Sequence, residues 1–386
     1  MNKFTKFVAS NWMLIIILVL AVFLRVYNLD DKEFGTDEDF SVNYSKVLIK
    51  GDFDSILSKD VHPPGYYLFI GVLLNIYDSV YFARIVSILI GIIGIIVFYF
   101  LALKLSDKKI ALLSSFLLAL NPMHVIYSSQ LRFYILLSLI YVLATWALYR
   151  FIFENNKKMI YLLAPLYIAS FYTHFYSVFI IGAHFLAVLF FWFKNKNIDI
   201  KRYFYGLLVV AFFALLYLPR FLKQFNYTIV QPGHFALESL KLHEVPYPFF
   251  KFASMINISA LNDMQYLFVL AGILSLLMLY GIYNFYRKDK DKAIFVSIIF
   301  FSIFIFPLVI NPFIALLSSG RTTLYYFRYL SFLVPFYVFF VAEGLDFRNK
   351  FLKYVLILLI VVGWAIVLNY YYNISVSGGW SKYIGV

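Results

Sequence analysis

Residues 80–103 read VYFARIVSILIGIIGIIVFYFLAL, a run of 24 residues that is almost wholly apolar. Such a run is long enough to cross the roughly 30 Å hydrocarbon core of a bilayer as a single helix. Ten further apolar runs follow the same pattern, at 12–27, 110–127, 133–153, 159–172, 175–193, 203–218, 264–286, 293–310, 325–341 and 351–372. The sequence therefore predicts an all-α polytopic membrane protein with about eleven transmembrane helices.

The composition of the 386 residues agrees with this class of protein. Hydrophobic residues make up 63% of the chain and charged residues 14%, against roughly 45–50% and 25% in a soluble domain. This excludes an ordinary soluble enzyme and a disordered or fibrous chain. The absence of cysteine excludes a disulfide, a thiolate metal site and a cysteine nucleophile. No repeat, nucleotide-binding loop or separate soluble domain is evident, so we predict one transmembrane domain over residues 1–386.

One short apolar segment controls the predicted topology. The stretch 65–77, GYYLFIGVLLNIY, is about 13 residues long and is too short to cross the bilayer comfortably. We predict that it lies in the membrane interface as a helix. With this choice, the basic clusters at 104–109, 150–158, 194–202, 287–292 and 348–353 share the side of Lys3 and Lys6.

The distribution of charge then identifies the two sides of the membrane. One side holds 19 basic and seven acidic residues, and the other holds 14 basic and 13 acidic residues. Because Lys and Arg accumulate in cytoplasmic loops, the first side is predicted to be cytoplasmic, together with the N-terminus. The C-terminus and the two large loops, 28–64 and 219–263, are predicted to face outward, which places function on that side. The net charge of +13 thus indicates topology, and no nucleic-acid partner is predicted.

The first outer loop contains nine acids in a chain that has few elsewhere: Asp30, Asp31, Glu33, Asp37, Glu38, Asp39, Asp52, Asp54 and Asp60. One interpretation is a solvated loop whose acids oppose the positive-inside signal. The other singles out Asp37 and Glu38, which follow Gly35 just beyond a membrane helix. A carboxylate there is a candidate general base or a ligand for a divalent cation.

Histidine and arginine side chains are predicted at the same membrane boundary. His62, in VHPPG at 61–65, precedes the interfacial helix as a capping residue or a contact to an anionic headgroup. Arg132 lies near a helix N-terminus, where a cation opposes the helix dipole and is a candidate anion ligand or a snorkelling side chain. Arg328 lies inside a span, two helical turns after Arg321, and an ionisable residue there is a functional-site hypothesis. His174 marks another helix end, as a ligand or an aromatic-belt residue.

The order of these features resembles the GT-C class of lipid-phosphate-sugar glycosyltransferases. The resemblance is to the family 39-like group, which contains protein O-mannosyltransferases and the lipid A aminoarabinose transferase. It rests on short motifs in sequence: Asp37-Glu38, His62-Pro63-Pro64, the run from Tyr127 to Tyr134, Thr173-His174-Phe175-Tyr176, and Arg328-Tyr329 followed by Pro335. The match covers most of residues 12–345 and implies a GT-C-like helix bundle.

The resemblance implies transfer of one sugar from a polyprenyl or dolichyl phosphate to an acceptor hydroxyl on the outer face, with inversion. The catalytic carboxylate of the family falls on Asp37, with Glu38 beside it. The implied substrate-binding residues are His62, Arg132, Tyr134, His174, Arg321, Arg328 and Tyr329. The acceptor would be a glycan, a glycolipid or a protein, and membrane lipids would surround the bundle.

The sequence departs from the family at one position. The family has a glutamate in the second outer loop where this chain has Gln130, which is neither a base nor a strong metal ligand. We therefore predict no cofactor and favour metal-free chemistry over a divalent metal ion. Two other classes stay open: a transporter of a lipid-linked saccharide or ion, which usually shows inverted repeats and midplane charges, and a non-catalytic scaffold.

Overall fold

The structure is a computed structural model of the whole chain. It describes residues 3–30, 32, 35–57, 60–195, 197–230, 244–255, 266–317 and 325–375. Within these ranges the chain is helical and contains no strand. The helices are α1 (Lys3–Val26), α2 (Thr36–Leu48), α3 (Asp54–Leu57), α4 (Gly65–Ile76), α5 (Val80–Leu105), α6 (Lys108–Leu120), α7 (Pro122–Ser128), α8 (Tyr134–Phe153), η1 (Lys157–Met159), α9 (Ile160–Thr173), α10 (Ser177–Asn195), α11 (Ile200–Val230), α12 (Tyr247–Ser254), α13 (Tyr266–Lys288), α14 (Lys290–Leu317), η4 (Phe327–Leu333), α15 (Val334–Gly344) and α16 (Lys350–Ser375).

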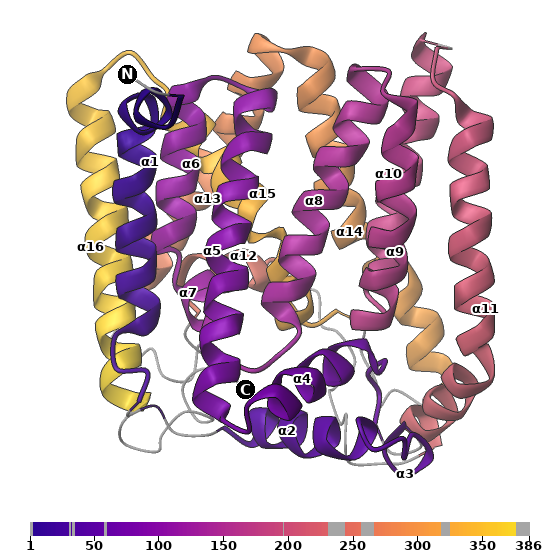
Figure 1. Ribbon diagram of the computed structural model, residues 1–386. Helices are drawn as coiled ribbons and strands as arrows, with labels where there is room; N and C mark the ends of the chain where they lie inside the picture. The colour runs from indigo at the N-terminus through magenta and orange to yellow at the C-terminus, as the bar shows by residue number, and fades with distance from the viewer. Residues whose placement is uncertain are drawn as a thin grey trace.

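Each of the eleven predicted apolar runs coincides with one helix or with two consecutive helices. In the described part of the chain, eight of these segments are long and apolar enough to cross a membrane by themselves, and the bent pair α6 and α7 makes a ninth. The described apolar part of α1, 11–26, and the 14-residue α9 are shorter than this, but both run alongside the longer helices (Figure 1). The predicted polytopic all-α fold is confirmed.

Short helices cover one end of this bundle. Figure 1 shows α2, α3 and α4 lying across the lower end, roughly perpendicular to the long helices. We call this end of the bundle the Asp37 end. The predicted interfacial segment at 65–77 is thus a helix that ends at Ile76 and does not traverse the bundle.

The predicted span over 110–127 consists of two helices that meet at Asn121. Asn121 ends α6, and its side-chain oxygen accepts the backbone N–H of His124 at 3.1 Å, which caps α7. Pro122 has no N–H to donate and occupies the first turn of α7 without cost. The two helices are bent by 61°. Because of this bend, the segment 129–133 that follows α7 lies at the Asp37 end of the bundle.

Two other predicted boundaries differ from the structure. The outer loop predicted over 219–263 begins later, because α11 continues through Pro219 to Val230, and α12 lies within the same stretch. Likewise, α14 continues through Pro307 and Pro312 to Leu317. A proline removes one backbone hydrogen bond but does not always end a helix, so it marks these boundaries poorly in a sequence.

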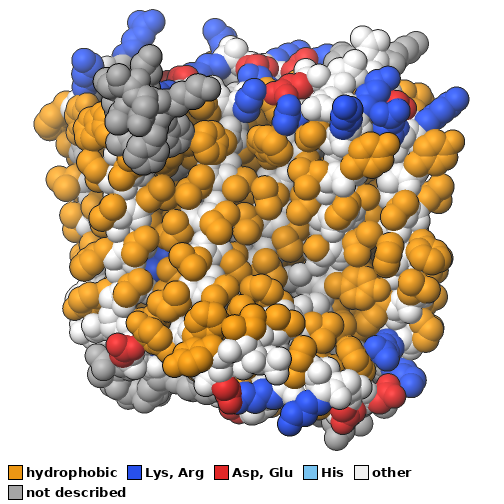
Figure 2. Space-filling model, viewed as in Figure 1, with side chains coloured by type: hydrophobic (Ala, Val, Ile, Leu, Met, Phe, Trp, Pro, Cys, Tyr) orange, Lys and Arg blue, Asp and Glu red, His pale blue; other side chains and the backbone are white. Residues whose placement is uncertain are grey.

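The opposite end of the bundle, which we call the basic end, carries the predicted basic clusters. Ion pairs between lysines of these clusters and nearby acids connect its helices. Lys109 and Lys288 both pair with Asp346, at 2.5 and 2.8 Å, and Lys104 pairs with Glu154 at 2.9 Å. Figure 2 shows Lys and Arg side chains along this upper rim, above a broad apolar belt. The grouping of these loops at one end agrees with the predicted topology.

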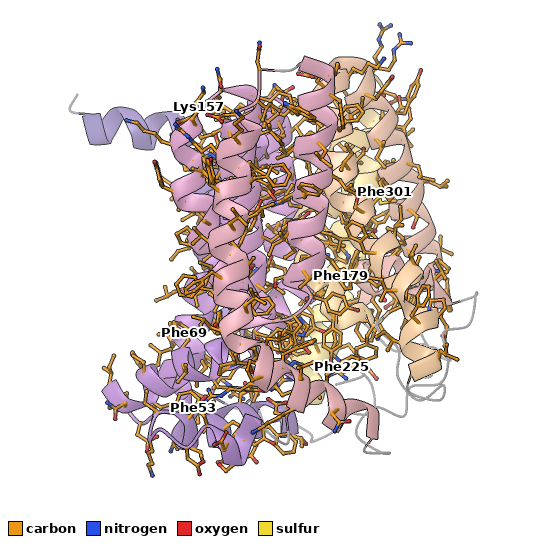
Figure 3. The ribbon with its side chains drawn as sticks, turned by 90° about the vertical axis from the view of Figure 1, so that its right-hand side faces the viewer. Phe53, Phe69, Lys157, Phe179, Phe225 and Phe301 are labelled. Carbon is orange, nitrogen blue, oxygen red and sulfur yellow. The ribbon has the colours of Figure 1, made fainter. Side chains whose placement is uncertain are left out.

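Aromatic and aliphatic side chains fill the space between the long helices. Figure 3 shows Phe179 and Phe301 within the bundle, whereas Phe53 and Phe69 belong to the cap of short helices. A close helix contact joins α13 and α15, where a Cβ on Gly281 would lie 1.8 Å from the Phe340 carbonyl oxygen. Glycine therefore permits this backbone approach. The contact fixes α15, and with it η4, which carries Arg328.

Candidate active site

Asp37 lies between two arginines that come from distant parts of the chain. Its Oδ2 accepts a hydrogen bond from Arg328 Nη1 at 3.1 Å and lies 3.8 Å from Arg132 Nε. Helix α2 positions the carboxylate in its first turn, where a negative charge is favoured by the helix dipole. Arg132 precedes α8, and Arg328 lies in η4. The structure thus brings three of the predicted site residues into direct contact.

Each arginine is held by further contacts around Asp37. Arg132 Nη1 donates to the main-chain oxygen of Asp37 and to Ser41 Oγ, both at 3.2 Å. Arg328 Nη2 donates to the Tyr326 hydroxyl at 2.7 Å, and the guanidinium carbon lies 4.5 Å from the centre of that ring. Ser41 and Tyr326 are site residues that the sequence analysis missed.

The site has spare hydrogen-bond donors and an excess of positive charge. Among the described residues, Nε of Arg132, Nε of Arg328 and the hydroxyl of Tyr134 are buried without a hydrogen-bond partner. Two guanidinium groups face one carboxylate, so the arrangement carries one net positive charge. Buried polar atoms are normally paired, so these unpartnered donors are candidate contacts for a substrate. An oxyanion satisfies both the donors and the charge.

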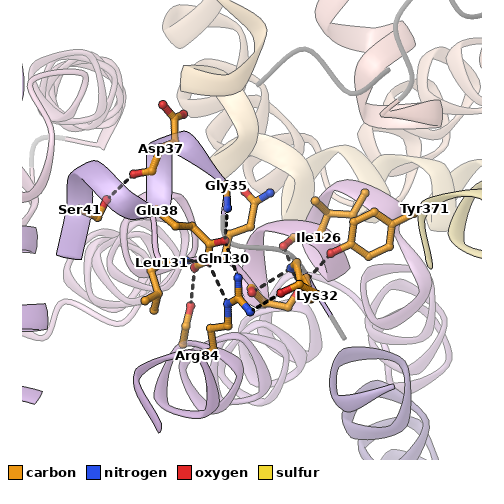
Figure 4. A network of polar contacts seen from close by, with 12 residues as sticks. Lys32, Gly35, Asp37, Glu38, Ser41, Arg84, Ile126, Gln130, Leu131 and Tyr371 are labelled. Carbon is orange, nitrogen blue, oxygen red and sulfur yellow. Dashed lines mark hydrogen bonds and ion pairs between the residues drawn. The ribbon is translucent and has the colours of Figure 1, made fainter. Parts of the chain in front are cut away.

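Glu38 occupies an environment unlike that of Asp37. It is 4% exposed, and its two carboxylate oxygens accept from Nε and Nη2 of Arg84 at 3.1 and 2.7 Å. Glu38 Oε1 also accepts the backbone N–H of Leu131 at 2.9 Å, and Oε2 accepts that of Gly35. Figure 4 shows the Asp37 side chain pointing away from this network. Glu38 ties α2 to α5 and to the segment before α8, which carries Arg132.

Arg84 is a third residue that the sequence analysis missed. It is the one charged residue of the run 80–103, and it is 4% exposed. A charge within an otherwise apolar span was itself a usable signal, because such residues are costly unless they are paired. Gln130 lies beside this network (Figure 4), and its main-chain oxygen accepts from Ser87 Oγ at 3.1 Å.

The predicted histidines and Tyr329 form an aromatic cluster next to the arginines. Phe133 stacks on His174 with ring centres 4.2 Å apart, and His62 lies 4.9 Å from the same phenylalanine. Tyr329 lies 4.8 Å from His174. Tyr134 contacts Phe133 at 4.4 Å, which links the cluster to the arginine site.

Both histidines are neutral at physiological pH. Burial lowers the pKa of the His174 imidazole to about 3, with a further contribution from Arg132. Burial, His174 and Arg132 also hold the pKa of His62 well below its ordinary value. The imidazoles therefore supply hydrogen-bonding groups and ring surface, whereas the arginines supply the positive charge.

The remaining predicted residue, Arg321, lies outside the described residues. In the described part of the chain, no three His, Asp or Glu side chains form a group that would hold a metal ion. Of the two acids predicted as catalytic, Asp37 is the one whose carboxylate faces the arginines, since Glu38 is engaged by Arg84.

The fold is that of the GT-C glycosyltransferase structures. The ArnT structure from Cupriavidus metallidurans with undecaprenyl phosphate matches with a TM-score of 0.64 and 14% identity over 93% of this chain. Its apo form matches with a TM-score of 0.61 and 15% identity over 89% of this chain. AglB, an archaeal oligosaccharyltransferase from Archaeoglobus fulgidus in complex with an inhibitory peptide and a dolichol-phosphate, matches with a TM-score of 0.56 and 16% identity over 98% of this chain.

A family model gives a more particular match. Residues 61–218 match the model of dolichyl-phosphate-mannose-protein mannosyltransferase. The chain spans 64% and 60% of the length of the two ArnT chains and 56% of the AglB chain. No curated protein matches the chain in sequence. The predicted resemblance to GT-C glycosyltransferases and the predicted fold class are confirmed.

Proposed function

We propose that this chain is a glycosyltransferase that moves one sugar from a polyprenyl or dolichyl phosphate to an acceptor hydroxyl. The observation that carries the proposal is the contact of Asp37 with Arg132 and Arg328, with an unused N–H on each arginine. A sugar attached to a lipid phosphate is a phosphodiester with one negative charge. That charge balances the one net positive charge of Asp37, Arg132 and Arg328 taken together. Guanidinium groups are also well suited to phosphate oxygens.

Donor binding would also change the state of Asp37. In the structure its carboxylate serves as the anion for both arginines. A phosphate that takes over Arg328 Nη1 and the free Nε atoms leaves the carboxylate available as a base. Asp37 would then remove the acceptor proton as the acceptor oxygen attacks the anomeric carbon. The bond from that carbon to the phosphate oxygen breaks, and the sugar configuration inverts.

Charge stabilisation at the leaving group would be the role of the arginines. The departing lipid phosphate gains a second negative charge, which Arg132 and Arg328 are positioned to neutralise. Hydrogen bonds already hold both side chains in place. Arg132 donates to the main-chain oxygen of Asp37 and to Ser41, and Arg328 donates to Tyr326. Phosphate is a good leaving group, so the reaction needs no general acid. Glu38 would act as a positioning residue that holds the Asp37 turn through Arg84.

The experiment that tests this function is transfer by the purified protein in lipid vesicles. Polyprenyl-phosphate sugars labelled in the sugar are supplied with glycan, glycolipid or peptide acceptors. Appearance of labelled acceptor together with an equal amount of free lipid phosphate is expected. Movement of the intact donor from one leaflet of the vesicle membrane to the other, without release of lipid phosphate, would indicate a transporter and overturn the proposal.

We also expect transfer to continue in EDTA. A metal-assisted reaction would need several oxygen ligands, and Gln130 replaces a glutamate while Glu38 is occupied by Arg84. The measurement compares initial transfer rates with and without EDTA, using magnesium or manganese add-back as the control. Loss of transfer that a divalent ion restores would make Asp37 a metal ligand.

The active site is proposed to face the outside of the cell membrane. The basic clusters gather at the opposite end of the bundle, which the positive-inside rule assigns to the cytoplasm. An accessibility tag inserted after Gly51 is expected to react from outside, and one at Lys108 only after the membrane is permeabilised. Reaction of both tags from the same side would refute this topology.

A further inference from the structure

Three buried polar atoms near Arg132 are not used by the proposed phosphate contact. They are Oδ2 of Asp60 and the hydroxyls of Tyr66 and Tyr134, and none has a hydrogen-bond partner among the described residues. Tyr66 and Tyr134 are each 3% exposed. Arg132 interacts electrostatically with all three side chains. Because buried polar atoms are normally paired, these three atoms are candidate contacts for a substrate.

Asp60 lies just before His62, in the segment that leads into α4. Its Oδ1 accepts the backbone N–H of Val61 at 2.7 Å, which fixes the orientation of the carboxylate. Burial raises the pKa of the Asp60 carboxyl above its ordinary value, and the Tyr67 hydroxyl and the charge of Arg132 oppose that rise. Although Asp60 lies this close to Arg132, its Oδ2 accepts no hydrogen bond from the guanidinium.

Aromatic rings border the same region. Tyr66 and Tyr134 lie with their ring centres 6.3 and 4.4 Å from that of Phe133. His62, two residues after Asp60, lies 4.9 Å from the same phenylalanine. The unpartnered atoms thus adjoin the aromatic cluster of the site. Aromatic walls with a few polar groups are typical of the places where proteins bind small molecules.

The chemistry of Asp60 argues against the phosphate as its partner, because an ionised carboxylate only accepts hydrogen bonds and repels another anion. The partner of Oδ2 is therefore a donor. A sugar whose phosphate is bound to Arg132 brings several hydroxyls to the surroundings of that arginine, and each hydroxyl both donates and accepts. The acceptor fits less well, since it has to reach Asp37, whose side chain is 25% exposed, whereas Oδ2 of Asp60 is buried.

We propose that Asp60 binds a hydroxyl of the transferred sugar through Oδ2, with the Tyr66 hydroxyl as a second contact, and thereby determines which sugar the chain accepts. This inference rests on the proposed function, because the phosphate on Arg132 and Arg328 is what brings the sugar to Asp60. A sugar that lacks the hydroxyl leaves Oδ2 buried and unpaired, which is the costly case. The role of Asp60 is in specificity, and Asp37 stays the base.

Equilibrium binding to the full chain in lipid nanodiscs, without an acceptor, tests this contact. The probes are polyprenyl phosphate without a sugar, a panel of polyprenyl-phosphate hexoses, and the monodeoxy forms of the hexose that binds most tightly. For wild type, we expect one monodeoxy form to bind about tenfold or more weakly than its parent, the effect of one hydrogen bond to a charged group.

Asp60→Asn is the first variant to compare. Its amide oxygen can still accept the Val61 N–H, while an NH₂ group takes the place of Oδ2. We expect the parent hexose and that monodeoxy form to bind this variant with nearly equal affinity, because the partner of the hydroxyl is gone. The affinity for sugar-free polyprenyl phosphate should stay unchanged. Asp52→Asn is the matched control, since Asp52 Oδ1 also accepts a backbone N–H, from Ser55 at 3.2 Å, but is exposed. It should alter none of these affinities.

Tyr66→Phe keeps the proposal testable should Asp60→Asn not fold. The hydroxyl that it removes has no partner within the described residues, so the unfolding temperature should be equal to or higher than that of wild type. Binding of the hexose donor should nevertheless weaken by about threefold to tenfold, the effect of one neutral hydrogen bond. Unchanged hexose binding by both Tyr66→Phe and Asp60→Asn would overturn the proposal.

The remaining outcomes separate this contact from the function on which it rests. If Asp60→Asn weakens sugar-free polyprenyl phosphate as much as the hexose donor, Asp60 contacts the phosphate and the inference fails. If every monodeoxy form binds wild type as tightly as its parent, no hydroxyl is bound there and the inference also fails. A chain that shows the expected binding pattern but transfers no sugar would contradict the proposed transferase function and still support the Asp60 contact.

Discussion

Asp37→Asn is expected to lower sugar transfer by at least roughly 100-fold, the low end of general-base contributions, while the lipid donor still binds. Asparagine keeps an oxygen that can accept from Arg328 Nη1 but cannot take the acceptor proton. It also removes the anion that competes with the donor for both arginines. Donor affinity should therefore be equal to or higher than that of wild type, so binding and turnover separate.

Transfer rate and donor affinity are measured on the same vesicle preparations. Asp39→Asn is the matched control, because Asp39 is an exposed acid in the same first turn of α2 and should leave both quantities unchanged. Near-normal transfer by Asp37→Asn would reject its role as the base and direct attention to Glu38. A parallel loss of donor binding would show that Asp37 mainly positions the arginines.

Arg328→Ala is expected to weaken donor binding by about tenfold to a hundredfold, corresponding to about 1.5–3 kcal/mol for a hydrogen bond to a charged group. The variant removes a guanidinium that faces Asp37 and lies over Tyr326. Arg328→Lys should restore only part of the affinity, because an ammonium cannot form a bidentate contact with phosphate. The dissociation constant of the polyprenyl-phosphate sugar is the quantity to measure.

Arg220→Ala is a suitable control for this variant. Arg220 lies on α11, 5.0 Å from the ring centre of Phe53, and is exposed. Its loss should not affect the donor. Unchanged affinity in Arg328→Ala would place the phosphate elsewhere, with Arg132 as the next residue to test.

Adjacent residues show what a sequence motif leaves undetermined. Asp37 and Glu38 are indistinguishable as a pair of acids, and both were predicted as catalytic. Successive helical residues point about 100° apart, since one turn holds 3.6 residues. One carboxylate therefore contacts Arg132 and Arg328, while the other contacts Arg84, and the packing of α2 on α4 decides which carboxylate faces which arginine.

The bundle itself was determined by the sequence. Span length is set by the thickness of the bilayer, and hydropathy and charge are local properties that can be counted along the chain. The same counting placed the acids, arginines and histidines at one end. The passage of α11 through Pro219 was less accessible, because the sequence does not show whether a helix stops at a proline or continues through it.

The contacts that make the site were decided by tertiary structure alone. Asp37 and Arg328 are separated by 291 positions, and Glu38 and Arg84 by 46. No local pattern encodes such distances, since they depend on how α13 and α15 approach and how α6 bends into α7. The sequence thus determined which residues share a membrane boundary, and helix packing determined which of them touch.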